Sequence, residues 1–249
     1  MKQRLLVAAI GVPLLLVVLL VLPPIATAIL AAAIAGAAAY ELLHTAAKKP
    51  AQLYVLTILC AVVTVMVIAT VAFWETSWGV RAYPAFAFLY VVGLFYKVVH
   101  LHGTSEEIPF KDLAVCIVAG FVFPAMYGCI ALLRNLGTAY VLMPFVVAFI
   151  GDSFSMFAGM IFGGKKMAPR VSPKKTWAGG IGGPVGSALG MVILGLIARA
   201  AWSMELPLWY LAVTGVIANV FGQLGDLSMS VIKREACIKD YSHIFLTHG

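Results

Sequence analysis

The stretch LYVLTILCAVVTVMVIATVAFW, residues 53–74, contains no charged side chain. About 20 consecutive apolar residues in a helix are enough to cross the roughly 30 Å hydrocarbon core of a membrane, so this stretch predicts a transmembrane helix. The rest of the chain is similar, because 63% of its 249 residues are hydrophobic and only 11% are charged. That composition excludes a soluble globular domain, in which about half of the residues are apolar. The apolar runs are continuous rather than alternating, which also excludes a transmembrane β-barrel.

We therefore predict an all-α, polytopic integral membrane protein with about eight transmembrane helices. Pro23 and Pro24 separate the first two apolar runs, because proline cannot continue the helical hydrogen-bond pattern. The fourth run is short, so a start nearer Trp78, or a failure to cross, stays open. No internal repeat or linker divides the sequence, and residues 1–249 are predicted to form one integral-membrane domain. The predicted spans are Leu5–Leu22, Ile25–Leu43, Leu53–Trp74, Tyr83–Tyr96, Leu113–Leu133, Thr138–Phe162, Gly180–Ala198 and Leu206–Leu224.

The basic residues are distributed unevenly over the loops that these spans create. The chain has 17 basic and 10 acidic residues, which give a net charge of +7. If all eight runs cross, only Arg81, Arg134 and Arg199 fall on the side opposite the N-terminus. Cytoplasmic loops carry the excess of Lys and Arg, so the N-terminus is predicted to lie on the cytoplasmic side of the cytoplasmic membrane. We interpret the positive charge as a determinant of orientation and not as a nucleic-acid-binding surface.

Two acidic residues lie within or at the ends of apolar runs. Asp152 belongs to the inward half of the sixth span, and Asp226 ends the eighth. An ionised carboxylate in hydrocarbon is costly unless it is paired, bound to a metal or exposed to a wet cavity, so both are candidate site residues. The alternative is that each is a helix-terminal carboxylate in contact with headgroup water.

The loop after the sixth span is rich in cations. It reads GGKKMAPRVSPKKTWAG over residues 163–179, with Ser172 and Thr176 as hydroxyl donors and Pro173 expected to stiffen the turn. Basic side chains, hydroxyls and exposed backbone amides suit a polyphosphate ligand. The spacing is not that of a Walker loop. A polybasic loop that attracts anionic lipid headgroups explains the same composition, and the composition leaves both interpretations open.

Hydroxyl and charged side chains follow Asp226 closely. If its helix continues through them, helical spacing places Asp226, Ser230, Lys233 and Arg234 on one face, an arrangement that suits a metal-bound phosphate. An amphipathic interfacial helix whose cations contact headgroups is the alternative.

The histidines and cysteines do not form a transition-metal site by spacing. His243 and His248 have no neighbouring ligand-type residue, so hydrogen bonding or phosphate contact is the favoured role for both. The four cysteines show no CxxC pair, so a zinc site or a disulfide framework is a poor interpretation.

Two segments resemble the hallmark sequences of CDP-diacylglycerol synthases, also called phosphatidate cytidylyltransferases. The first is SVIKREACIKD, residues 230–240, which is followed by His243 and by His248-Gly249. The second comprises Gly151-Asp152-Ser153 and, further on, Ser172–Thr176. Because long mixed-charge patterns with fixed spacing are rare in membrane helices, the resemblance is specific, and it extends over the whole chain.

This resemblance implies the transfer of a cytidylyl group from CTP to phosphatidate, with release of pyrophosphate. It implies Mg²⁺ as cofactor, Asp226 as a metal ligand and Asp152 as a second acidic group near the metal or nucleotide. CTP, phosphatidate and membrane lipids are the implied partners, and a homodimer is left open. The residues implied to hold phosphates or nucleotide, or to belong to the catalytic motif, are Ser172, Lys174, Lys175, Thr176, Ser230, Lys233, Arg234, Lys239, Asp240 and His248.

The sequence also departs from the family pattern. Ala178 and Met229 stand where the family has glutamate, and Met160 stands where it has lysine. The sequence ends at Gly249, before the family's second glycine, its Asp-Arg-x-Asp segment and a ninth span. We therefore expect a C-terminally truncated synthase with little activity of its own. The alternative is that the sequence is a fragment of a normal, active enzyme.

Two other functions are compatible with the same residues. One is another CTP-using lipid phosphotransferase or kinase. The other is a cation- or proton-coupled transporter, because intramembrane carboxylates also mark ion pathways. A transporter predicts polar residues through the whole depth of the membrane, whereas here the charged residues gather on one side.

Overall fold

The computed structural model describes residues 2–48, 50–74, 77–238 and 241. The chain forms two compact units, of which the first comprises Met1–Gly137 with Ile238–Gly249 and the second comprises Thr138–Cys237. The prediction of one domain stays a prediction, because two compact units can belong to one membrane domain. Each unit is described by itself below.

The apolar helices confirm the predicted all-α, polytopic class. Within the described residues, seven helices are long and apolar enough to cross a membrane, and a shorter apolar helix, Ala9–Val21, precedes them. These segments are Pro24–Ala46, Tyr54–Trp74, Arg81–Leu101, Phe110–Leu136, Thr138–Phe162, Trp177–Trp202 and Leu208–Glu235.

Two predicted boundaries differ from the structure. The fourth run lies within helix Ser77–Leu101, which agrees with the open alternative of a start nearer Trp78, and its segment Arg81–Leu101 is long and apolar enough to cross. The helix that carries the eighth span does not end near Asp226 but continues to Glu235. Hydropathy shows where a chain leaves the hydrocarbon, whereas the helix ends only where its hydrogen-bond pattern stops. Asp226 therefore lies inside a helix that continues through Ser230 and Arg234, which is the condition for these residues to share one face.

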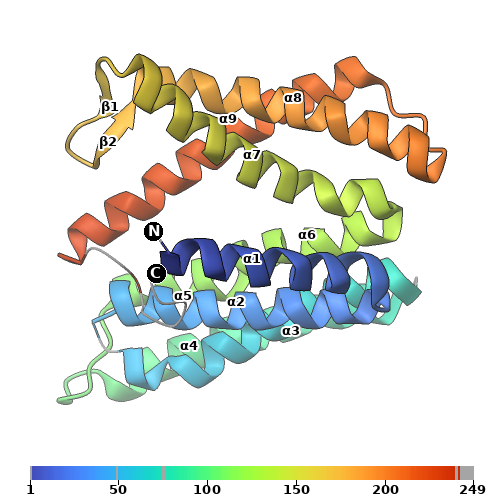
Figure 1. The fold of residues 1–249 in the computed structure, drawn as a ribbon. Helices are drawn as coiled ribbons and strands as arrows, with labels where there is room; N and C mark the ends of the chain where they lie inside the picture. The colour runs from blue at the N-terminus through green and yellow to red at the C-terminus, as the bar shows by residue number, and fades with distance from the viewer. Residues whose placement is uncertain (1, 49, 75–76, 239–240, 242–249) are drawn as a thin grey trace. The chain divides into compact units, whose positions relative to one another are not determined.

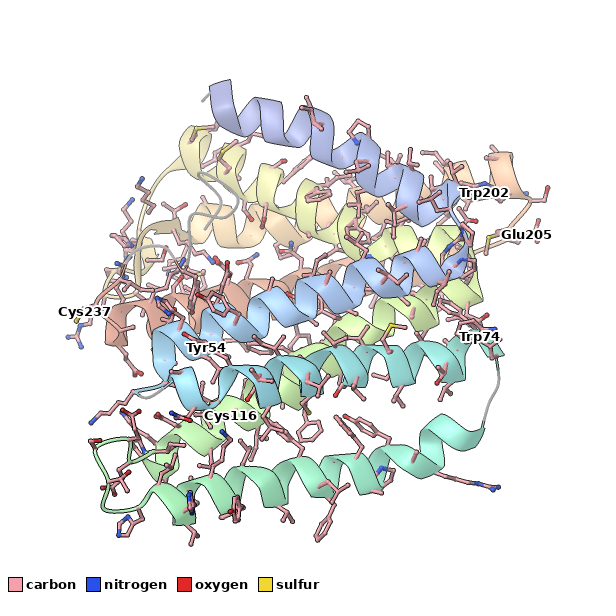
Figure 2. All side chains as sticks on the ribbon, turned by 90° about the horizontal axis from the view of Figure 1, so that it is seen from below. Tyr54, Trp74, Cys116, Trp202, Glu205 and Cys237 are labelled. Carbon is pink, nitrogen blue, oxygen red and sulfur yellow. The ribbon has the colours of Figure 1, made fainter. Side chains whose placement is uncertain are left out.

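The first unit is a bundle of helices. Tyr54 and Trp74, labelled in Figure 2, mark the two ends of its most apolar helix. Its helical elements in chain order are α1 (Lys2–Leu16), η1 (Val17–Val21), α2 (Pro24–Ala46), η2 (Pro50–Gln52), α3 (Tyr54–Trp74), α4 (Ser77–Leu101), α5 (Phe110–Ile117), η3 (Val118–Val122) and α6 (Phe123–Leu136).

Small side chains allow the helices of this unit to approach closely. Helix α2 begins after Pro23 and buries Ala28, Ala31 and Ala35 against α3 and α6. Small residues are typical of helix contacts in membranes, where no water is displaced and van der Waals packing provides the attraction. Near the end of α5, just before the π-helix η3, the hydroxyl of Tyr90 lies 3.0 Å from the carbonyl oxygen of Cys116. Such hydroxyls satisfy backbone groups that an irregular helix leaves without an intrahelical partner.

The second unit contains three long helices and a β-hairpin, shown in Figure 1 with the hairpin at the end where α7 meets α8. The strands pair antiparallel, with Lys166 opposite Thr176 and Ala168 opposite Ser172. Pro173 lies in the second strand, so the prediction that it stiffens the turn is wrong. The elements are α7 (Thr138–Phe162), β1 (Lys166–Ala168), β2 (Ser172–Thr176), α8 (Trp177–Trp202) and α9 (Leu208–Glu235).

The hairpin starts where two glycines end helix α7. Gly163 and Gly164 have φ angles of 55° and 89°, which side chains other than glycine rarely adopt. At the other end of the hairpin, the Trp177 amide donates to the Lys165 carbonyl oxygen over 3.0 Å. These two features fix both ends of the cationic loop predicted from the sequence.

Glycines on α8 determine how closely the three helices of this unit pack. A Cβ atom added to Gly179 would lie 2.7 Å from the carbonyl oxygen of Ser155 on α7. On α9, a Cβ atom added to Gly215 would lie 2.7 Å from the carbonyl oxygen of Ser187 on α8. Backbone atoms cannot move aside as a flexible side chain can, so the helix contacts require these glycines.

We predict that Gly215→Ala destabilises the protein, because its new methyl group meets backbone at a helix contact. Such overpacking costs about 1–3 kcal/mol. Gly225→Ala is the matched control on the same helix, since a Cβ atom there meets nothing within 4 Å. Thermal unfolding in detergent is expected to show a lower midpoint for Gly215→Ala and an unchanged or higher one for Gly225→Ala. Equal midpoints would contradict the packing argument.

Candidate active site

A pocket of about 450 Å³ lies at the hairpin end of the second unit. Its wall combines one face of α7, both strands of the hairpin, the first turn of α8 and the middle of α9. The predicted site residues that line it are Asp152, Lys174, Lys175, Thr176 and Asp226. Lys166 also lines the pocket, so acidic and basic side chains from separate segments meet there.

The two carboxylates reach the pocket from different helices. Asp152 is on α7 and Asp226 is on α9, where 63% of the Asp226 side chain is exposed. Lys175 on β2 forms an ion pair with Asp226 through Nζ and Oδ2. Asp152 lies close enough to interact electrostatically with both Asp226 and Lys175. The pocket therefore contains two carboxylates and one ammonium that interact electrostatically with one another.

Thr176 has a structural role at the edge of the pocket. It is the N-cap of α8, and its side-chain oxygen accepts a hydrogen bond of 3.2 Å from the Gly179 amide. Its side chain is buried, whereas Lys174 on the same strand is exposed. The predicted contact between Thr176 and nucleotide stays a prediction, and the capping bond is what the structure adds to it.

The remaining described candidates do not line the pocket. The Ser230 hydroxyl donates to the Asp226 carbonyl oxygen over 2.8 Å, which occupies it within its own helix. Arg234 Nε donates to the Val171 carbonyl oxygen over 3.3 Å and so ties the end of α9 to the hairpin turn. Ser172 is in β2 and Lys233 is near the end of α9, and neither is part of the pocket wall. Their predicted contacts with ligands stay predictions.

Four sequence candidates lie outside the described residues. They are Lys239, Asp240, His243 and His248.

Comparison with known proteins places the chain in a family. Residues 2–249 match the model of the Cytidylyltransferase family. The chain belongs to this family. The phosphatidate cytidylyltransferase of Bacillus subtilis (strain 168) is 30% identical over 100% of the chain and 90% of its own length.

Two staphylococcal relatives match over shorter segments. The phosphatidate cytidylyltransferase of Staphylococcus saprophyticus is 31% identical over 59% of the chain, and that match spans 55% of the relative. The one from Staphylococcus haemolyticus is 28% identical over 76% of the chain and 68% of the relative. The match to the first of these therefore spans little more than half of the relative's length.

In this cytidylyltransferase-family chain, the pocket also contains polar residues that the sequence prediction missed. Gln223 lines the pocket, and its Nε2 donates to the Gly180 carbonyl oxygen over 3.1 Å and to Asn219 Oδ1 over 2.7 Å. Asn219 is buried, with 4% of its surface exposed. Residues 219, 223 and 226 share one helical face. The sequence could have indicated Asn219 and Gln223 through this polar stripe in an otherwise apolar run. The sequence prediction considered only the charged member of that stripe.

The donor atoms of the pocket fit a metal ion that is bound partly by the substrate. No group of three or more His, Cys, Asp or Glu side chains that could hold a metal occurs among the described residues. Asp152 and Asp226 nevertheless offer carboxylate oxygens to one pocket. Magnesium commonly takes one or two carboxylates, several waters and substrate phosphate oxygens, so this pair suits that ion.

We predict that Thr176→Val lowers stability even when no nucleotide is present, because it removes the N-cap bond of α8. Loss of such a cap costs about 1 kcal/mol. Thr176→Ser keeps a hydroxyl at the same position and is expected to retain most of the stability. The measurement is thermal unfolding of both variants in detergent without CTP. A Thr176→Val variant as stable as the wild type would show that the capping bond contributes nothing.

Proposed function

We propose that this chain transfers a cytidylyl group from CTP to phosphatidate, giving CDP-diacylglycerol and pyrophosphate. The observation that carries the proposal is the pocket in which Asp152 and Asp226 meet Lys166, Lys174 and Lys175. The family match over residues 2–249 and the name of the Bacillus subtilis relative support the same activity.

The reaction is a displacement at the α-phosphorus of CTP. A phosphate oxygen of phosphatidate forms the new bond to this phosphorus, and the bond to the bridging oxygen of the leaving pyrophosphate breaks. Both reactants are anionic, so their mutual repulsion has to be offset before they can approach. Fixed positive groups next to the reacting phosphates act mainly through positioning and electrostatic stabilisation.

The lysines supply that positive charge in our proposal. Lys166, Lys174 and Lys175 lie on the two strands of the hairpin and face one pocket. Ammonium groups form charge-assisted hydrogen bonds with phosphate oxygens. The hairpin is held at Trp177 and Thr176, so its backbone keeps these side chains at the pocket.

Asp152 and Asp226 would hold magnesium in this proposal. When bound, the ion supplies neutralisation of the charge that grows on pyrophosphate. Lys166, Lys174 and Lys175 would orient the phosphates next to that ion. Gln223 positions Asp226 indirectly, because it bonds α8 and lies one turn away from that aspartate on α9.

The orientation in the membrane belongs to the same proposal. The lysines of the pocket are on the side of the N-terminus when all spans cross, and the excess of basic residues on that side predicts the cytoplasm. The active site would then face cytoplasmic CTP, while phosphatidate and surrounding lipids reach it from the membrane. A homodimer stays a prediction of the sequence resemblance.

We predict that Asp226→Asn abolishes formation of CDP-diacylglycerol, because the substitution keeps the size of the side chain but removes its charge. The assay uses a purified form of the protein whose wild type is active, together with CTP, phosphatidate and limiting magnesium, and both CDP-diacylglycerol and pyrophosphate are measured. Glu205→Gln, which also removes one acidic charge, does not line the pocket and is expected to leave activity unchanged. Near-normal turnover of Asp226→Asn would count against this function for the aspartate.

We also predict that Lys174→Ala and Lys175→Ala each weaken CTP binding by about tenfold or more, as expected for lost hydrogen bonds to a charged group. Arg170→Ala is the control, because it removes a positive charge from the hairpin turn without touching the pocket wall. Titration with CTP distinguishes the two interpretations of this loop. If all three variants bind CTP as the wild type does, the loop attracts headgroups instead.

A further inference from the structure

The ion pair between Lys175 and Asp226 connects the hairpin to helix α9 at the pocket. The Lys175 side chain is only 25% exposed, so the pair is partly removed from water. A second link between the same elements is the 3.3 Å hydrogen bond from Arg234 Nε to the Val171 carbonyl oxygen. Together the two contacts hold the hairpin against α9 at both its second strand and its turn.

The pair conflicts with the use of Asp226 as a metal ligand. Its Oδ2 atom is covered by the lysine ammonium, and that oxygen is one of the few carboxylate oxygens that the pocket offers. A divalent cation and an ammonium repel each other at the short distance that a shared carboxylate imposes. The Lys175 ammonium and a divalent cation therefore weaken each other's binding to the Asp226 carboxylate.

We propose that Lys175 is the resident counterion of Asp226 and exchanges this carboxylate for the nucleotide phosphates when a divalent cation arrives. This proposal rests on the proposed function, since it takes Asp226 as a metal ligand. Without a cation, Lys175 offsets the repulsion between Asp152 and Asp226, which interact electrostatically. With a divalent cation bound between the carboxylates, Lys175 would no longer be needed to offset their repulsion, and its ammonium would be free to bind the nucleotide phosphates.

The local structure allows the lysine side chain to move while the backbone stays in place. Thr176 caps α8, and Trp177 bonds to Lys165, so the base of the hairpin is fixed next to Lys175. The lysine side chain has four rotatable bonds and carries a compact charge that forms no fixed fork. Asp226, by contrast, is set in the middle of a long helix.

The exchange couples cation binding to nucleotide binding. In the empty pocket, Lys175 lowers the affinity for divalent cations. Nucleotide phosphates that bind the Lys175 ammonium increase this affinity, because they remove the lysine from Asp226. By linkage, the cation then raises the affinity for nucleotide by the same factor. Lys175 thus acts as a positioning residue for Asp226 in the empty pocket and as a phosphate ligand in the loaded one.

The test measures binding of Mn²⁺ alone to the full chain, without nucleotide or lipid. Lys175→Gln and Lys174→Gln are matched, because both remove one positive charge from β2 at the pocket but only Lys175 contacts Asp226. We expect Lys175→Gln to bind Mn²⁺ about fivefold or more tightly than Lys174→Gln, the lower end of common coupling effects. Lys175→Arg keeps the charge and is expected to bind as weakly as the wild type.

Two further measurements keep the outcomes separate. Asp226→Asn is expected to lose Mn²⁺ binding; wild-type binding by this variant would overturn its role as a metal ligand and the exchange with it. If Asp226→Asn loses binding but the two glutamine variants bind equally, the exchange is overturned and the metal site stands. Mn²⁺ is also expected to raise the unfolding temperature of Lys175→Gln more than that of Lys174→Gln, and Lys175→Met provides a second neutral variant if the first folds poorly.

Discussion

The close contact of α8 with α7 and α9 is the feature on which the candidate site depends. Inside a membrane, helices gain nothing from releasing water, so their association relies on short-range packing and hydrogen bonds. Gly179 and Gly215 permit backbone contacts that any side chain would prevent. Asp152 and Asp226 converge on one pocket because the helices that carry them are drawn together through α8.

Polar groups in the same interface add specificity to this packing. Gln223 bonds to Asn219 and to the Gly180 carbonyl oxygen, and Ser187 donates to the Val147 carbonyl oxygen over 3.1 Å. These contacts satisfy side chains that would be costly to bury alone. They also favour one relative position of the helices, since a shift along the helix axis would separate the partners. Gln223 therefore contributes both to the packing of α9 on α8 and to the geometry of the pocket.

The hairpin brings positive charge to the edge of this three-helix unit without extending a helix into the cationic sequence. Its three lysines line one pocket with Asp152 and Asp226, and Lys175 pairs with Asp226. The arrangement has nearly balanced charge before any ligand is present. In our proposal, such a pocket accepts a highly charged substrate by exchanging the partners of charges that are already present.

Much of the fold was predictable from local features of the sequence. Hydropathy identifies runs such as residues 53–74 because a membrane helix satisfies its own backbone and needs only apolar side chains around it. The same local view identified Asp152 and Asp226, since charges are rare in such runs. It missed the β-hairpin in which Lys166 lies opposite Thr176, because a short hairpin depends on contacts between strands. It also missed Gln223, because this side chain carries no charge.

The sequence by itself determined the class of membrane protein, the approximate positions of its apolar helices and the charged character of the site, because each follows from the character of neighbouring residues. Only the tertiary structure decided which charges meet. Lys174 and Lys175 are equivalent by composition, and both line the pocket, yet Lys175 alone of the two pairs with Asp226. That choice depends on the register of the hairpin and on its position against α9, and both are set by contacts between segments far apart in the chain.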